Sequence, residues 1–341
     1  HLMFDYSDTH TAKEYEKKQK RNGLASIMSK QMYEGTRHPL NLKYHTIKNS
    51  IFAVDIDPSA VDITKLRLWL SLVVDQETDE NAVDDGMHAV TRNPRPLPNL
   101  DCNIRCGNSL IDELDGAKLI NESDLFGNRD YQISVGQNQY DLLLSRLFEA
   151  QDRLFYEKNH SEKEQIKRSI RSIIDNIVLL NLGEGINPAI VEKYNEVKNQ
   201  PSPPFFLWQL EFARVFKEKG GFDVVIGNPP YVDSETMVKS DAKLRKIYSQ
   251  KYVSAKGNWD LFIIFVELGY NISSKLGILT YIIPNKIIAS DYAKTIRALM
   301  NKNSVSEIRD YSNVRVFKEA AVYPITFLSN KLNNNEFVKL G

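Results

Sequence analysis

Short apolar runs alternate with amphipathic segments along most of the chain. The apolar runs predict strands at 51–55, 103–106, 222–226, 277–283, 305–311 and 322–328. Helices are predicted after Asp57-Pro58, over 261–268 and over 290–302. In the first of these, Ile63, Leu66, Leu70 and Val74 fall on one face. This order favours an α/β fold with a mainly parallel, doubly wound sheet.

A helical segment interrupts the alternation between residues 112 and 205. Ser161 and Glu164 form a predicted capping box at the start of its second arm, and isoleucines repeat there at helical spacing. We expect an inserted helical hairpin with a packing role. The predicted regions are a polar N-terminal segment (1–46), the first part of the core (47–111), the helical insertion (112–205), the second, chemistry-bearing part of the core (206–332) and a tail (333–341).

The amino-acid composition excludes few classes of function. The 44 basic and 44 acidic residues cancel, but between residues 239 and 302 nine lysines and two arginines face only four acids. This local excess of positive charge favours contact with the phosphates of a nucleic acid. The alternative is that these residues only form the solvent-exposed face of a helix. Cys102 and Cys106 have no companion pair, so we expect no metal site. The chain shows neither a signal peptide nor a membrane-length apolar run, so we expect a cytoplasmic protein without a membrane partner.

The run Asn228-Pro229-Pro230-Tyr231 follows the predicted strand 222–226 directly. Ligands of open α/β sheets bind beyond the carboxyl ends of the strands. The prolines fix the backbone and remove two donors, which leaves the Pro229 carbonyl and the Asn228 side-chain oxygen as acceptors. These acceptors suit the two N–H groups of an amine on a base, and Tyr231 offers a face for stacking. The alternative is a rigid turn with a surface tyrosine.

The chain resembles N6-adenine DNA methyltransferases, and most of all the methyltransferase part of restriction–modification polypeptides that fuse methylation and cleavage. The motifs that carry the resemblance are FAVDIDPSAVDITKLRLWLSL, RCGNSLI, GGFDVVIGNPPYV, GNWDLFIIFVELG, LGILTYIIPNKIIAS and VRVFKEAAVYPITFL, in that order. The resemblance implies a Rossmann-like methyltransferase sheet, S-adenosylmethionine as cofactor and double-stranded DNA as partner. It also implies that the target base is flipped out of the helix.

The resemblance further implies roles for individual residues. Asp55 would bind the cofactor's ribose hydroxyls and Asp57 would cap the following helix, unless either acid is only a helix cap. Ile56 would pack on the cofactor's adenine unless it is a core residue. Asn108 stands where the family often has an aspartate that touches the adenine amine, or it is a turn residue. Asn228 would border both the cofactor and the base. Phe317 would stack on the base opposite Tyr231, or it is an ordinary core phenylalanine.

One motif of the family is not found. Its first strand is followed by a glycine-bearing turn, whereas Gly23 and Gly35 stand alone in residues 1–50. We therefore expect the first strand to be missing, with its place closed by its neighbours or filled by another chain. The N-terminal and target-recognition parts of a longer parent would lie elsewhere. The chain alone would then be inactive, or it would be a non-catalytic DNA-binding fragment. Among enzymes, cytosine-N4, RNA-base and protein-glutamine methylation stay open.

Overall fold

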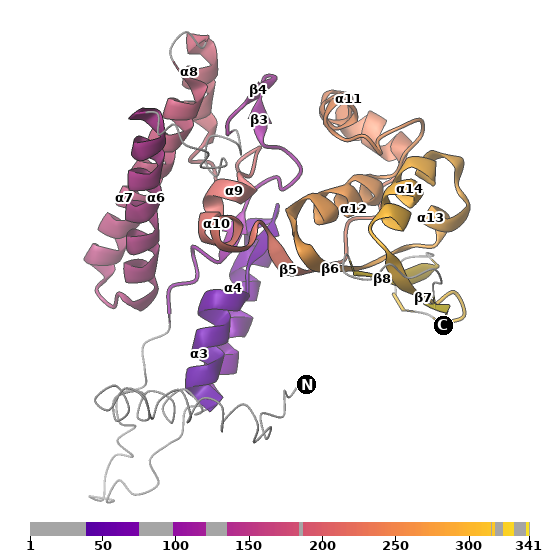
Figure 1. Cartoon of the computed structure of the whole chain (residues 1–341), viewed down its shortest axis with the longest axis horizontal. Helices are drawn as coiled ribbons and strands as arrows, with labels where there is room; N and C mark the ends of the chain where they lie inside the picture. Colours follow the sequence, from indigo (N-terminus) through magenta and orange to yellow (C-terminus); the bar gives the residue numbers. More distant parts are fainter. Residues whose placement is uncertain are drawn as a thin grey trace, which may run out of the picture.

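The computed structural model describes residues 39–74, 98–120, 135–183, 187–314, 316–317, 323–330 and 339–340. Most of the polar N-terminal segment, the first strand expected upstream and most of the tail lie outside these residues. The described chain is an α/β protein, as predicted. Figure 1 shows a helical group around α6–α8 on one side and the larger sheet with α11–α14 on the other, with α9, α10 and β5 between them.

The strands form three sheets. β1 (Ala53–Asp55) pairs in parallel with β2 (Ile104–Cys106), and β3 (Glu113–Leu114) forms a short hairpin with β4 (Ala117–Lys118). The larger sheet has the order β5-β6-β8-β7-β9. Its strands are β5 (Phe222–Gly227), β6 (Ser273–Pro284), β7 (Val305–Asp310), β8 (Pro324–Asn330) and β9 (Lys339–Leu340).

The larger sheet is mixed, so the prediction of a mainly parallel sheet is wrong for it. β5 runs parallel to β6, but β8 lies between β6 and β7 and is antiparallel to both. Apolar runs show where strands occur. They do not show the direction in which a late strand returns to the sheet, because both directions bury the same side chains.

β1 and β5 face each other without pairing. Of these two strands, one cavity contacts only the amino ends, and a second runs along both strands to their carboxyl ends, so the two strands run in the same direction. Among the described residues, no strand lies between them. The rings of Phe52 and Phe222 meet across this space at 5.8 Å. The two halves of the molecule therefore meet where a first strand was expected to be missing, and the neighbouring strands do not close the ladder there.

Helices α3 (Pro39–Ser50) and α4 (Pro58–Val73) support β1 and β2. Asp57 caps α4 as predicted, since its side chain accepts a hydrogen bond from the Ser59 amide at 2.9 Å. The four residues predicted to share one face of α4 do not form its buried face. Val61 and Leu72 are buried, in a cluster that includes Ile47 of α3. The predicted stripe, by contrast, is at least half exposed. α4 is apolar around most of its circumference, so spacing alone selects more than one face.

The inserted helical hairpin is confirmed as α6 (Val135–Tyr156) and α7 (His160–Leu182), and α8 (Pro188–Val197) follows it. The predicted capping box is wrong. Asn159 caps α7 through bonds from the amides of Ser161 and Glu162, so the helix begins before Ser161.

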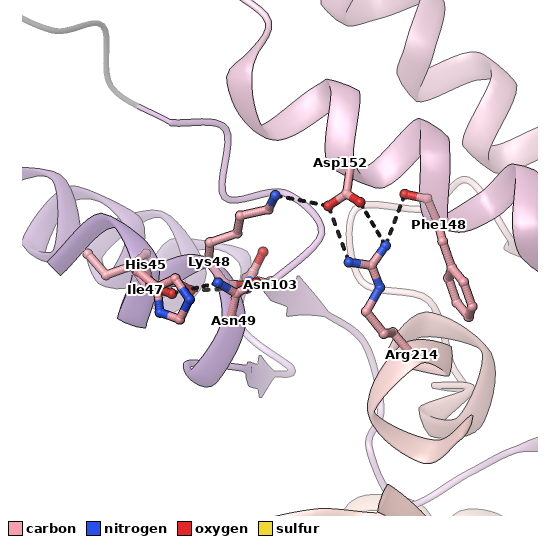
Figure 2. Close-up of polar contacts among 8 residues, drawn as sticks. All are labelled: His45, Ile47, Lys48, Asn49, Asn103, Phe148, Asp152 and Arg214. Atoms are coloured by element: carbon pink, nitrogen blue, oxygen red, sulfur yellow. Dashed lines mark hydrogen bonds and ion pairs between the residues drawn. The ribbon is translucent and has the colours of Figure 1, made fainter. Parts of the chain in front are cut away.

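Asp152 of α6 joins the hairpin to the rest of the molecule (Figure 2). Its carboxylate lies 3.0 Å from the Lys48 ammonium of α3. It also accepts from both terminal nitrogens of Arg214, at 3.3 and 2.9 Å. Burial opposes ionisation of Asp152, but hydrogen bonds from Arg214 and Lys48 outweigh it and lower the pKa of the carboxyl. The remaining helices are α9 (Trp208–Glu211), α10 (Ala213–Lys219), α11 (Ser234–Lys251), α12 (Leu261–Ile272), α13 (Lys286–Ala289) and α14 (Lys294–Lys302).

Candidate active site

The Asn-Pro-Pro-Tyr run leaves the carboxyl end of β5 at a fixed angle. Asn228 is exposed and Pro229 is buried. Tyr231 is half-buried, and its hydroxyl donates to the carbonyl of Ile282 on β6 at 3.1 Å. This burial raises the pKa of Tyr231, so its ring carries a neutral hydroxyl. No described residue hydrogen-bonds the Asn228 side chain. Its amide oxygen therefore stays open to a substrate donor.

A cavity of about 610 Å³ runs along the gap between β1 and β5 and reaches the carboxyl ends of both strands. Asp55 and Ile56 line one wall, the run from Gly227 to Pro230 lines another, and Asn108 contributes a third. This volume lies within the range of small-molecule sites. The sequence predicted each of these residues separately, and the structure brings them to one cavity.

The side chains of Asp55 and Asp57 make different contacts. One carboxylate oxygen of Asp55 accepts from the Asp57 amide at 2.8 Å, and the Asp55 side chain is otherwise exposed at the rim of the cavity. Its second oxygen can accept hydroxyl donors. Ile56 is 60% exposed and lines the same cavity, so the alternative of a core isoleucine is wrong. An exposed apolar side chain beside a carboxylate is suited to a ligand with a flat ring and a sugar.

Asn108 is buried and held by the turn that follows β2. Its side-chain oxygen accepts from the Leu110 amide at 3.1 Å, so it is a turn residue. Its side-chain nitrogen donates to the hydroxyl of Tyr248 on α11 at 3.1 Å. Sequence reasoning did not single out Tyr248. It stands in a polar helix without a motif, and only the fold brings it to the cavity.

Tyr231 and Phe317 are neighbours. Their ring centroids lie 6.0 Å apart with an angle of 76° between the planes. Phe317 is half-buried rather than fully enclosed, and it reaches Tyr231 from the segment before β8. The two predicted residues are therefore in contact, and one of them, Tyr231, lies three positions after Asn228 in the sequence. A role of either ring in stacking stays a prediction.

Asp260 starts α12, but its side chain makes no capping bond. It accepts from the Tyr292 hydroxyl at 2.8 Å and lies 3.8 Å from the Lys286 ammonium.

The two arginines of the basic stretch make hydrogen bonds within the protein. Arg245 bonds the Ser234 hydroxyl and the Gly257 carbonyl, and Arg297 bonds the carbonyls of Ile287 and Ser290. The excess charge that can face a phosphate is thus carried by lysines.

The described residues contain no cluster of three or more histidine, cysteine, aspartate or glutamate side chains that could hold a metal ion. None of their helices is long and apolar enough to cross a membrane.

Residues 49–317 match the family model described as Eco57I restriction-modification methylase. This match covers well over half of the chain. The chain belongs to this family.

Named relatives agree with this assignment. The methylase chain is 34% identical over 117 residues to the type II restriction enzyme and methyltransferase RM.Eco57I of Escherichia coli, a match that covers 34% of the chain and 12% of that protein. It is 29% identical over 136 residues to the type II methyltransferase M.BstVI of Geobacillus stearothermophilus, covering 39% of the chain and 23% of that protein.

Among solved structures, the type IIG restriction endonuclease BpuSI matches with a TM-score of 0.26 and 17% identity, over 35% of the chain and 14% of that protein. The methylase chain thus spans less than a quarter of the length of each of these three relatives.

The residues that line the cavity suit the nucleoside part of S-adenosylmethionine, the cofactor expected from the sequence. A nucleoside needs an acceptor for its ribose hydroxyls and an apolar surface for its base, and Asp55 and Ile56 supply these side by side. Asn108 keeps one lone pair of its side-chain oxygen for a base amine. S-adenosylmethionine bound there would supply an electrophilic methyl group beside Asn228.

Proposed function

We propose that this methylase chain forms the methyl-transferring part of a restriction–modification enzyme that methylates the N6 amine of adenine in double-stranded DNA, with S-adenosylmethionine as the donor. The observation that carries the proposal is the position of Asn228. It lies at the end of β5, on the rim of the cavity that also presents Asp55, Ile56 and Asn108. Acceptors for an amine and a site for a nucleoside therefore share one opening.

Asn228 and Pro229 act on the substrate amine. The Asn228 side-chain oxygen and the Pro229 carbonyl each accept one N–H of the amine, which directs the nitrogen lone pair toward the cofactor. No strong base is required, because the amine proton becomes acidic once the nitrogen carries the methyl group and then passes to solvent. The methyl–sulfur bond would break in the same step, and the donor would leave as S-adenosylhomocysteine. Tyr231 and Phe317 hold the base after it leaves the DNA stack, and their contacts offset part of the unstacking cost.

The proposal is tested by Asn228→Ala in the full-length gene product. We expect methylation to fall below detection while cofactor affinity stays within about threefold of wild type, since one hydrogen bond to the substrate is lost and none to the ribose. Normal methylation by the variant would refute the assignment. Mass spectrometry of digested DNA, RNA and protein substrates identifies the product. If the product is N4-methylcytosine, a methylated RNA base or methylglutamine, that product replaces N6-methyladenine in the proposal. If the protein only binds DNA, without needing the cofactor, the non-catalytic alternative is favoured.

A further inference from the structure

Tyr248 enters the cofactor cavity from an element that the family motifs do not include. It stands on α11, 140 positions from Asn108, and its side chain is 5% exposed. It lines the same cavity as Asp55 and Ile56. A buried polar group that faces a ligand cavity contributes to ligand specificity. A ligand that cannot form a hydrogen bond with this group leaves the group buried without a partner, which costs binding free energy.

The hydroxyl hydrogen of Tyr248 is engaged only by a long contact to Asn108, which a better-placed ligand acceptor can replace. Asn108 donates to the hydroxyl oxygen at 3.1 Å, so that oxygen acts as an acceptor there. In the reverse direction, the hydroxyl is 3.5 Å from the Asn108 side-chain oxygen, which already accepts from Leu110. That second contact is at the outer limit for an O–H donor. Burial raises the pKa of Tyr248, so the hydroxyl remains a donor at neutral pH.

α11 is held firmly over the turn that contains Asn108. Lys251 bonds Asp112 at 2.6 Å, and the Tyr252 hydroxyl donates to the Leu110 carbonyl at 2.9 Å. These contacts come from the last turn of α11, next to Tyr248. The Tyr248 ring is therefore fixed in place relative to Asn108 before any ligand binds.

We propose that Tyr248 recognises the adenine ring of the cofactor by donating a hydrogen bond to ring nitrogen N1. The Asn108 side-chain oxygen accepts from the neighbouring amine. Adenine presents this amine donor and the N1 acceptor side by side on one edge. The protein presents the complementary acceptor and donor side by side, on Asn108 and Tyr248. This inference rests on the proposed function, since it assumes an adenosyl cofactor in the cavity.

The test is a cycle of protein and ligand variants in the full-length gene product. Calorimetry compares S-adenosylhomocysteine with its 1-deaza analogue, in which N1 is a C–H group, and with its 3-deaza analogue as ligand control. Tyr248→Phe removes the donor. Tyr252→Phe is the matched protein control, because it loses a buried hydroxyl on the same helix that does not line the cavity. Thermal unfolding of each variant without ligand reports structural damage.

We expect wild type to bind the 1-deaza analogue about tenfold more weakly than S-adenosylhomocysteine, the size of one hydrogen bond. Tyr248→Phe should bind S-adenosylhomocysteine about tenfold more weakly and no longer distinguish the two ligands. Tyr252→Phe should distinguish them as wild type does. Equal binding of both ligands by wild type would overturn the inference even if the Tyr248 variant fails to fold. An equal loss for all three ligands in Tyr248→Phe would overturn it too, since Tyr248 would then only hold the turn of Asn108. If wild type binds S-adenosylhomocysteine but makes no N6-methyladenine, the proposed substrate fails while this inference stands.

Discussion

The rings of Tyr231 and Phe317 contact each other edge to face, with centroids 6.0 Å apart. A base held between two rings needs nearly parallel planes and a centroid separation of about 7 Å, twice the roughly 3.4 Å spacing of stacked bases. The observed pair fills that space with its own contact. Binding of a flipped base therefore requires the two rings to separate and turn, and the energy of their own contact is lost in exchange.

Loss of either ring should weaken capture of the flipped base. Stacking contributes about 1–3 kcal/mol per base, so Tyr231→Ala and Phe317→Ala should each lower methylation by about 5- to 150-fold. 2-Aminopurine at the target position reports flipping through its fluorescence, and both variants should change that response. DNA affinity should stay near wild type because it comes mainly from phosphate contacts. Tyr231→Phe is the control that keeps the ring and loses only the bond to Ile282. Unfolding of Phe317→Ala, seen by circular dichroism, would instead assign that ring to the core.

Asp55 and Asp57 form a matched pair for the cofactor site. Asp55→Ala should weaken S-adenosylhomocysteine binding by about 10- to 100-fold, since hydrogen bonds to a charged group contribute about 1.5–3 kcal/mol. Asp57→Ala removes the cap of α4 and should cost about 1 kcal/mol in the free energy of unfolding, with little change in affinity. Calorimetry and urea unfolding measure the two effects. The reverse pattern would assign the ribose contact to Asp57.

The sequence predicted the β1–α4 turn and the Asn-Pro-Pro-Tyr site because those features are local. A strand followed by Asp57-Pro58 has one reasonable conformation, and two prolines after a buried strand leave few others. The inward face of α4 was not predictable in the same way. Its residues are apolar on several sides, and the choice depends on Ile47 and Phe155, which come from α3 and α6.

Two further errors have different origins. Asn159 and Ser161 both suit a helix cap, and they differ by two positions, so only the observed bonds distinguish them. Tyr248 gave no signal because its role depends on a contact with Asn108 across 140 positions. A residue whose function comes from a long-range contact is identified by the fold and not by the local pattern.

Gly221 should tolerate no side chain where β5 begins. It adopts φ +143°, and an added Cβ would lie 2.6 Å from the Ile272 carbonyl oxygen and 2.7 Å from the Ser274 nitrogen. Because these are backbone atoms where α12 ends and β6 begins, relief would require the β5–β6 register to shift. We expect Gly221→Ala to cost about 3 kcal/mol or more in the free energy of unfolding. Gly220→Ala is the control, with φ +69° and open space around the added atom, and should cost about 1–2 kcal/mol. Equal costs in urea unfolding would show that the close approach at Gly221 does not matter.

Asp101 should make stability depend on pH in the acidic range. It lies between Lys65 of α4 and Lys167 of α7, at 2.5 and 2.8 Å, and so joins the core to the inserted hairpin. Burial opposes its ionisation, but hydrogen bonds from Lys167 and Lys65 outweigh it and hold the pKa of this carboxyl at about 2, below the ordinary value of 3.8. A lowered pKa stabilises the folded state fully above the unfolded-state value. The contribution is lost as pH falls from about 4 to about 2, where the folded carboxylate takes up its proton.

The expected size of the effect follows from the shift. It corresponds to roughly 2.5 kcal/mol before screening, and because the side chain is 33% exposed we expect about 1–2 kcal/mol. Asp101→Asn should therefore unfold about 1–2 kcal/mol more easily than wild type at pH 7, and the difference should shrink between pH 4 and pH 2. Asp115→Asn is the control, since its pair with Lys193 is 56% exposed on the aspartate side and should contribute less than about 0.5 kcal/mol. Urea unfolding of the three proteins across this range measures the difference. A gap between wild type and Asp101→Asn that stays constant down to pH 2 would mean that the two lysines do not stabilise the carboxylate, and that the hairpin is held to the core by its apolar contacts and by Asp152.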